Sequence, residues 1–134
     1  MATVLSDHNC EGHAQLLLEA LDREGFAALL GLELKLFRDV ELAPDADDET
    51  VWAFCQLHGF LLLTGNRSAR DGDASLEMVL RRRALDARLP ILTIGDLDRV
   101  LHDAEYRWRC AERMVDIILN LDRYQGVRRL YLPG

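Results

Sequence analysis

Residues 60–64 (FLLLT) form a run in which only the last side chain is polar. A surface helix would mix apolar and polar residues over a longer stretch, whereas a short continuous apolar run is typical of a strand covered on both faces. Asn66 and Arg67 follow this run after a single glycine. The run therefore predicts an inner strand of an α/β sheet, with polar side chains at the end where such sheets usually bind ligands.

The rest of the chain alternates strand-like and helix-like patterns around this run. Strands are expected at residues 2–6 (ATVLS), 30–36, 91–94 (ILTI) and 128–133 (RRLYLP). Apolar residues spaced three and four apart predict helices that end near Gly25 and Gly59, a helix at residues 75–88, and a long one that is broken near Asp103. This alternation predicts right-handed crossovers and a single three-layer α/β domain, with a central, mostly parallel sheet of four or five strands, the first strand in the middle, and helices on both faces.

Length and composition fit this architecture. At 134 residues, with 49% apolar and 29% charged residues, the chain is long enough for one core and short for two. It has no apolar run near the roughly 18 residues that cross a bilayer, and its start lacks the basic and then apolar pattern of a secretion signal. Cys10, Cys55 and Cys110 are odd in number and form no CxxC pair, which argues for buried thiols and against disulfides. A cytoplasmic protein without a membrane partner is expected.

Polar side chains lie where several predicted strands and helices meet. Asp7 follows the first strand, Asn66 the third and Asp96 the fourth, while Asp48 lies at the start of the helix before the third strand. Parallel strands bring these ends to one edge, and carboxylates gathered there require a cation because like charges repel. Oxygen ligands suit Mg²⁺ or Mn²⁺, which support phosphodiester hydrolysis. Each aspartate is also a good helix cap, so capping is the competing interpretation.

Two segments of the chain resemble one known family. VLSDHN, at residues 4–9, is similar to the LLDEN opening of the short PIN-like proteins, a bacterial branch of the PilT N-terminus nuclease fold often found beside toxin-antitoxin genes. DDETVWAFCQLHGFLLLTGNR, at residues 47–67, resembles the second block of that family, in which an acidic helix start leads to a strand that ends near an aspartate. The likeness covers roughly residues 3–67.

The resemblance implies a metal-dependent nuclease site. It places Asp7 on the family's first metal-binding aspartate and Asp48 on the acidic position at the helix start. The third acidic position falls on Asn66, whose amide offers a carbonyl oxygen but no charge and cannot act as a base. His8 and Gly65 also depart from the family pattern. Metal affinity is therefore expected to fall unless a further carboxylate compensates, and the candidates are Asp71, Asp73, Glu77 and Asp96.

These observations leave two hypotheses about function. In the first, the chain is a ribonuclease, of the toxin-antitoxin type, in which Asp7, Asp48 and Asp96 hold Mg²⁺ or Mn²⁺ and Asn66 orients water. Phosphate contacts are then expected from Arg67, Arg70, Arg81 and Arg82. In the second, Arg67 pairs with Asp7, and the chain is an inactive binding or regulatory module that acts through an antitoxin-like protein or as a homodimer. A receiver-like phosphoacceptor domain is disfavoured, because the chain has SDHN after the first strand and no lysine except Lys35.

Overall fold

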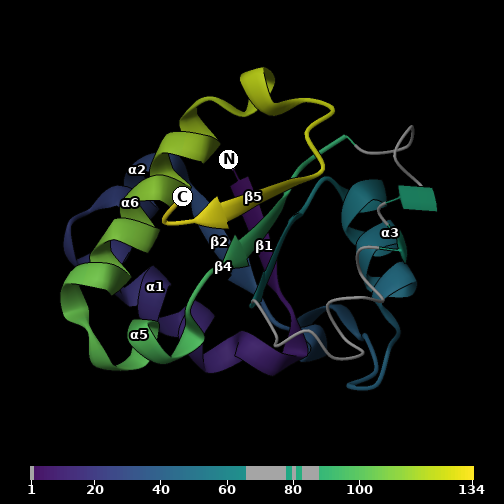
Figure 1. The fold of residues 1–134 in the computed structure, drawn as a ribbon, viewed down its shortest axis with the longest axis horizontal. Helices are drawn as coiled ribbons and strands as arrows, with labels where there is room; N and C mark the ends of the chain where they lie inside the picture. Colours follow the sequence, from purple (N-terminus) through teal and green to yellow (C-terminus); the bar gives the residue numbers. More distant parts are fainter. Residues whose placement is uncertain (1, 66–77, 80, 83–87) are drawn as a thin grey trace.

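The computed structural model describes residues 2–65, 78–79, 81–82 and 88–134 of the chain (Figure 1). Its strands are β1 (Ala2–Ser6), β2 (Leu32–Lys35), β3 (Leu61–Gly65), β4 (Ile91–Ile94) and β5 (Arg129–Leu132). Its α-helices include α1 (Glu11–Arg23), α2 (Phe26–Leu30), α3 (Asp48–His58), α5 (Leu97–His102) and α6 (Ala104–Leu119). Short 3-10 helices also join elements in the described residues, among them η1 (His8–Cys10), η2 (Phe37–Val40) and η4 (Leu121–Tyr124).

The five strands form one sheet in the order β2-β1-β3-β4-β5, and every neighbouring pair is parallel. The predicted parallel α/β sheet is confirmed. The first strand is interior, as expected, but the central position belongs to β3, which takes in most of the FLLLT run and whose five residues, LLLTG, are all buried. The alternating stretch at residues 30–36 is the edge strand β2, and its Glu33 and Lys35 side chains share one face, with 3.7 Å between their charged atoms.

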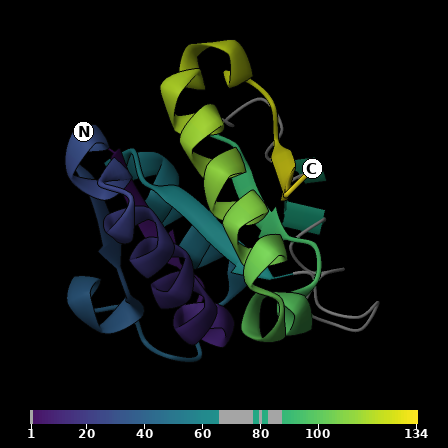
Figure 2. The same ribbon diagram turned by 90° about the vertical axis from the view of Figure 1, so that its left-hand side faces the viewer.

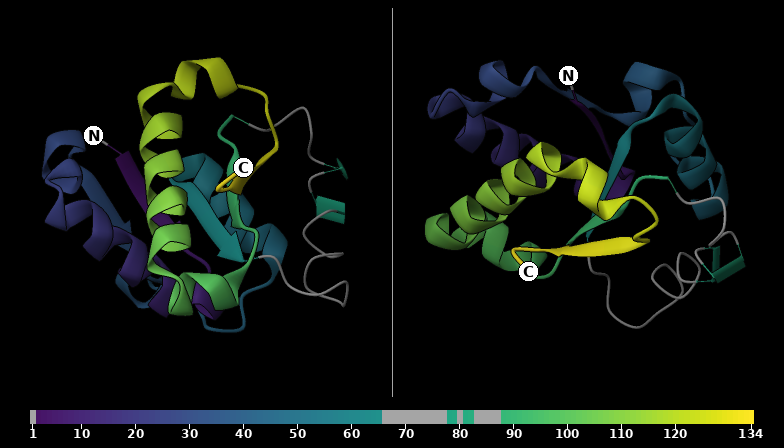
Figure 3. Two further views of the ribbon diagram at one scale, coloured as in Figure 1. Left: turned by 60° about the vertical axis from the view of Figure 1, so that its left-hand side comes forward. Right: turned by 90° about the horizontal axis from the view of Figure 1, so that it is seen from above.

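Helices cover both faces of the sheet, giving three layers (Figure 3). On one face, α1 and α6 pack against the sheet through a core that includes Leu17, Leu21, Leu63 and Ile117. On the other face, α3 packs through Val51, Trp52 and Cys55, together with Leu62. No helix in the part of the chain that the structure describes is both long and apolar enough to cross a bilayer.

One crossover departs from the predicted right-handed connections. In the sheet, β2 lies on one side of β1, whereas β5 lies on the opposite side of β4. The helices that make these two connections, α1 and α6, nevertheless cover the same face (Figure 2). The β1-α1-β2 unit is right-handed, so the β4-α6-β5 unit is left-handed, which is rare. The short helix α5 causes this turn, because Val100 packs into the same core cluster as α1 and directs the chain onto that face before α6 begins.

The predicted break in the last helical region is confirmed at Asp103. Its carboxylate accepts a hydrogen bond from the Tyr106 backbone N–H at 3.1 Å and thereby starts α6. The preceding helix ends there because the Arg107 guanidinium donates to the carbonyls of Val100 at 2.7 Å and Leu101 at 3.0 Å. The helix α2 was not predicted, because its sequence FAALL is an apolar run without a helical repeat of its own.

Candidate functional site

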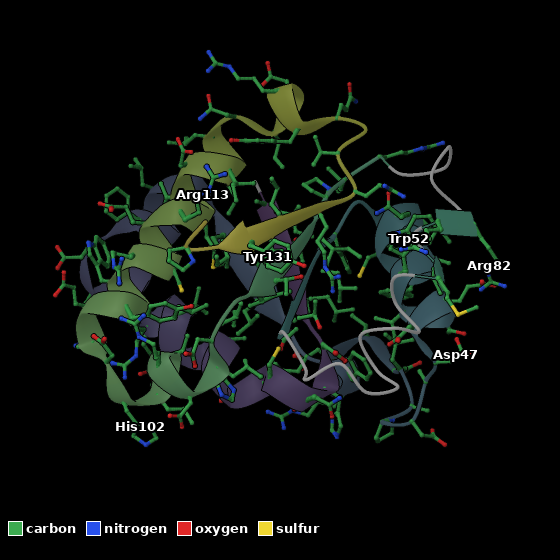
Figure 4. All side chains as sticks on the ribbon, in the orientation of Figure 1. Asp47, Trp52, Arg82, His102, Arg113 and Tyr131 are labelled. Atoms are coloured by element: carbon green, nitrogen blue, oxygen red, sulfur yellow. The ribbon has the colours of Figure 1, made fainter. Side chains whose placement is uncertain are left out.

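All five strands end at one edge of the sheet, here called the carboxyl edge. The crossover helices run back over the sheet, so α1, α3 and α6 begin at this same edge, and Asp47 at the start of α3 is labelled there in Figure 4. Asp7 follows β1, whose two neighbours β2 and β3 are reached in opposite directions along the sheet. Such a reversal of strand order is where open parallel sheets bind ligands.

The Asp7 carboxylate is held against β3. The Asp7 backbone N–H donates to the Leu63 carbonyl at 2.8 Å, and this hydrogen bond continues the pairing of β1 with β3 beyond the end of β1. Its Oδ2 atom accepts a hydrogen bond from the Thr64 hydroxyl at 3.2 Å. Asp7 precedes η1, but its side chain makes no capping hydrogen bond to that helix. The capping interpretation therefore does not describe Asp7.

Buried thiols lie beneath Asp7. The Cys10 sulfur is 3.6 Å from the Leu63 carbonyl oxygen and 3.6 Å from the Ser6 hydroxyl. Burial and then the negative charge of Asp7 raise the pKa of the Cys55 thiol to about 12. This thiol is therefore neutral at physiological pH. All three cysteines are buried and unbridged, as the sequence predicts.

At the start of α3, the cap is Asp47 and not Asp48. The Asp47 carboxylate accepts from the Thr50 backbone N–H at 2.8 Å, and this hydrogen bond lowers its pKa. Asp48 is the first residue of the helix and is half-buried, while the next residue, Glu49, pairs with Arg82 at 2.6 Å. Asp48 therefore lies at the carboxyl edge, as predicted, with the capping role taken by its neighbour.

Asp96 has a different role from Asp7. Its Oδ1 accepts from the Arg99 backbone N–H at 3.1 Å and caps α5. The next side chain, Leu97, packs on Gly65 so closely that a Cβ atom added there would lie 2.5 Å from Leu97 Cδ1. Asp7 follows β1 and Asp96 follows β4, two strands that are roughly 10 Å apart because β3 lies between them. Leu97, packed on the end of β3, therefore lies between the two aspartates. This contact also explains the glycine at position 65.

The remaining predicted residues divide between two parts of the chain. Arg81 and Arg82 are exposed and helical, as expected. Within residues 2–65, 78–79, 81–82 and 88–134, no three histidine, cysteine or acidic side chains are placed to hold one metal ion. The other predicted site residues lie outside the described residues: Asn66, Arg67, Arg70, Asp71, Asp73 and Glu77.

Two contributors at this edge were not predicted from the sequence. Thr64 orients Asp7, and its only sequence signal is a hydroxyl at the end of an apolar strand. His8 lies with its ring centroid 5.7 Å from that of Phe37, and its Nδ1 is 3.4 Å from the Glu11 carboxylate. The spacing of His8 and Glu11, one helical turn apart, was the available signal for this pair.

No protein-family model, curated protein or solved structure matches the chain. The similarity to short PIN-like proteins thus rests on the two segments at residues 4–9 and 47–67. Function is therefore inferred from the residues at the carboxyl edge.

Proposed function

We propose that this chain is a cytoplasmic, PIN-like, metal-dependent ribonuclease that hydrolyses phosphodiester bonds at the carboxyl edge, beside β1 and β3. The observation that carries this proposal is the Asp7 carboxylate, which lies where the strand order reverses and is oriented by Thr64 at 3.2 Å without capping a helix. Asp48, at the start of α3, supports it from the same edge. The resemblance at residues 4–9 and 47–67 supports the same assignment.

The donor set fits a hard divalent cation. Asp7 and Asp48 would supply carboxylate oxygens and Asn66 an amide oxygen, which suit Mg²⁺ or Mn²⁺, whereas the nearby thiols are buried and protonated. When bound, such a cation lowers the pKa of water and offsets charge on the phosphate. Asp96 is a weaker candidate ligand, because its carboxylate caps α5.

The chain's own residues would do the rest of the work. Thr64 fixes the Asp7 carboxylate, Asn66 orients water, and Leu97 closes the side of the site that faces β4 with an apolar wall. Arg67 and Arg70 would contact the phosphate. Arg81 and Arg82 would extend that contact along the RNA, with Arg82 partly neutralised by Glu49, so RNA binding should weaken as salt rises.

Thermal unfolding with and without Mn²⁺ tests this proposal. A ligand that binds only the folded chain raises its melting temperature, so Mn²⁺ should stabilise the wild type. Asp7→Asn should abolish that gain and the Mn²⁺-dependent cleavage of a single-stranded RNA, while Asp45→Asn, an exposed acid in the loop before α3, should retain both. Equal Mn²⁺ effects in the wild type and in Asp7→Asn would refute Asp7 as a ligand.

The Asn66→Asp variant separates the nuclease from its alternative. Restoring the acidic position should raise Mn²⁺ affinity and RNA cleavage together. The alternative is an inactive binding module that acts through an antitoxin-like protein or as a homodimer, and it is favoured by the amide at position 66 and by the capping role of Asp96. Tighter Mn²⁺ binding without cleavage in Asn66→Asp would favour the module.

A further inference from the structure

A second surface lies away from Asp7, along the outer side of β5, which is an edge strand of the sheet. A groove of about 360 Å³ runs between α6 and the end of β5, and it is lined by Arg109, Glu112, Arg113, Asp116, Pro133 and Gly134. The four charged residues are spaced three, one and three positions apart, so they form one row along the outer flank of α6. Figure 1 shows β5 and this flank of α6 side by side, on the side of the sheet opposite β2.

The charges in this row are only partly matched. Arg113 donates to Asp116 at 2.8 Å and to the Tyr124 hydroxyl at 3.3 Å. The Arg109 guanidinium lies 5.6 Å from the Tyr106 ring. Among the residues that the structure describes, neither Arg109 nor Glu112 has an ion-pair partner. The groove therefore presents one cation and one anion, one helical turn apart, to an incoming chain.

The strand below the groove is suited to further pairing. β5 is the last strand of the sheet, and the carbonyls of Arg128 and Leu132 already accept from Ile91 and Gly95 of the β4 side at 2.9 Å. In a parallel ladder, alternate residues direct their backbone groups to opposite sides, so the Tyr131 N–H points away from β4. The Tyr131 side chain is 46% exposed, and Figure 4 shows Tyr131 and Arg113 on opposite sides of the β5 ribbon.

We propose that β5 and this groove bind an extended segment of a partner protein as a sixth strand. Side chains of a strand alternate between the two faces of a sheet, so the bound segment alternates apolar and charged residues. Its apolar residues contact Tyr131, and its charged residues meet the α6 row, an acidic one at Arg109 and a basic one at Glu112. Backbone pairing with β5 supplies affinity, and the row supplies specificity.

Charge argues against the two other occupants. A nucleic acid would bring phosphates to Glu112 and Asp116, which repel them. A second copy of the chain, paired through its own β5, would place Leu130 and Leu132 on the groove side, because these leucines share the face that α6 covers. That strand would then offer Arg109 and Glu112 no charged partner, since Leu132 is already buried in its own core and Leu130 packs against it.

The test uses a fluorescein-labelled nine-residue peptide that alternates valine with glutamate and lysine, titrated with the full chain and followed by anisotropy. Binding should be lost with a peptide of the same composition whose charges are grouped at one end. Arg109→Glu should weaken binding at least tenfold, and a peptide with lysine in place of its glutamates should restore it. Arg123→Glu makes the same charge change in η4, which precedes the amino end of β5 and does not line the groove, and should have no effect.

Several results would overturn the proposal. These are no peptide binding by the wild type, equal losses in Arg109→Glu and Arg123→Glu, displacement of the peptide by a single-stranded RNA, or a dimer in sedimentation that Arg109→Glu dissociates. Amide NMR shifts confined to β5 and α6 would support it independently of the variants. Since none of these measurements requires Asp7 or a metal, they remain decisive if the ribonuclease proposal fails.

Discussion

Two aspartates lie at neighbouring parts of the same sheet edge but have different roles. Asp7, after β1, is oriented by a hydroxyl of the adjacent strand, whereas Asp96, after β4, caps the helix that begins beside it. The difference comes from the residues that follow each aspartate in the sequence. A three-residue 3-10 helix begins after Asp7 and donates no hydrogen bond to its side chain, whereas the first turn of α5 donates one to Asp96.

The same sheet edge thus has a candidate ligand site at the end of β1 and helix caps at the end of β4. Leu97 packs on Gly65 at the end of β3, the strand between β1 and β4, and so lies between the two ends. At the β4 end, Asp96 and Asp103 both cap helices, and Arg99 pairs with Asp103 at 3.1 Å. The carboxylates of Asp96 and Asp103 therefore stabilise the starts of α5 and α6.

The largest expected loss of stability comes from disturbing the contact between Leu97 and Gly65. Gly65→Val should force Leu97 out of its position, since even a Cβ atom would lie 2.5 Å from Leu97 Cδ1. Overpacking of this kind costs about 1–3 kcal/mol of unfolding free energy, measurable by urea denaturation. Leu97→Ala in the Gly65→Val background should recover much of that loss, as expected for residues in contact. Additive losses in the double variant would contradict the proposed wall.

The second prediction compares the two aspartates directly. Asp96→Ala should lower the free energy of unfolding by about 0.5–2 kcal/mol, the usual cost of losing a helix cap. Asp96→Ser should retain most of the stability, because serine also caps. In metal-free buffer, Asp7→Ala should lose less than Asp96→Ala, since the Asp7 side chain caps no helix. A larger loss at Asp7 in urea denaturation would show that the two ends had been assigned in reverse.

The third prediction uses pH to test the β4 end. The Tyr106 N–H and the Arg99 guanidinium lower the pKa of Asp103. A depressed carboxyl pKa contributes stability that is present above the unfolded-state value near 4 and is lost as pH falls through the folded-state value. Asp103→Asn should therefore be less stable than the wild type at neutral pH, and the gap should close below about pH 4. A gap that stays constant in urea midpoints from pH 3 to 7 would exclude this role.

Much of the fold could be predicted because its signals are local and periodic. The FLLLT run, the glycine after α3 and the break at Asp103 depend on neighbouring residues alone. The left-handed crossover could not be predicted, since it depends on where Val100 packs. At the site, the position of Asp7 can be inferred from the strand before it. Capping by Asp96 was one of the two interpretations that the sequence allowed, and the choice between them depends on backbone angles. The reason for Gly65 depends on a contact across 32 positions, between residues 65 and 97, which no local pattern contains.

The smallest expected effect concerns Thr64, which links Asp7 to β3. Thr64→Val keeps the shape of the side chain but removes the donor to Asp7 Oδ2. Because Asp7 is only half-buried, water can replace that donor, so the loss in unfolding free energy should stay below about 1 kcal/mol. The effect on a bound cation should be larger, since a partner that orients a ligating carboxylate typically changes metal affinity by about 10-fold or more. We therefore expect Thr64→Val to reduce the Mn²⁺-dependent gain in melting temperature while Thr64→Ser retains it. If both variants kept the full gain, Thr64 would be a packing residue. The difference between Asp7 and Asp96 would then depend only on Leu97 and on the cap that Asp96 provides.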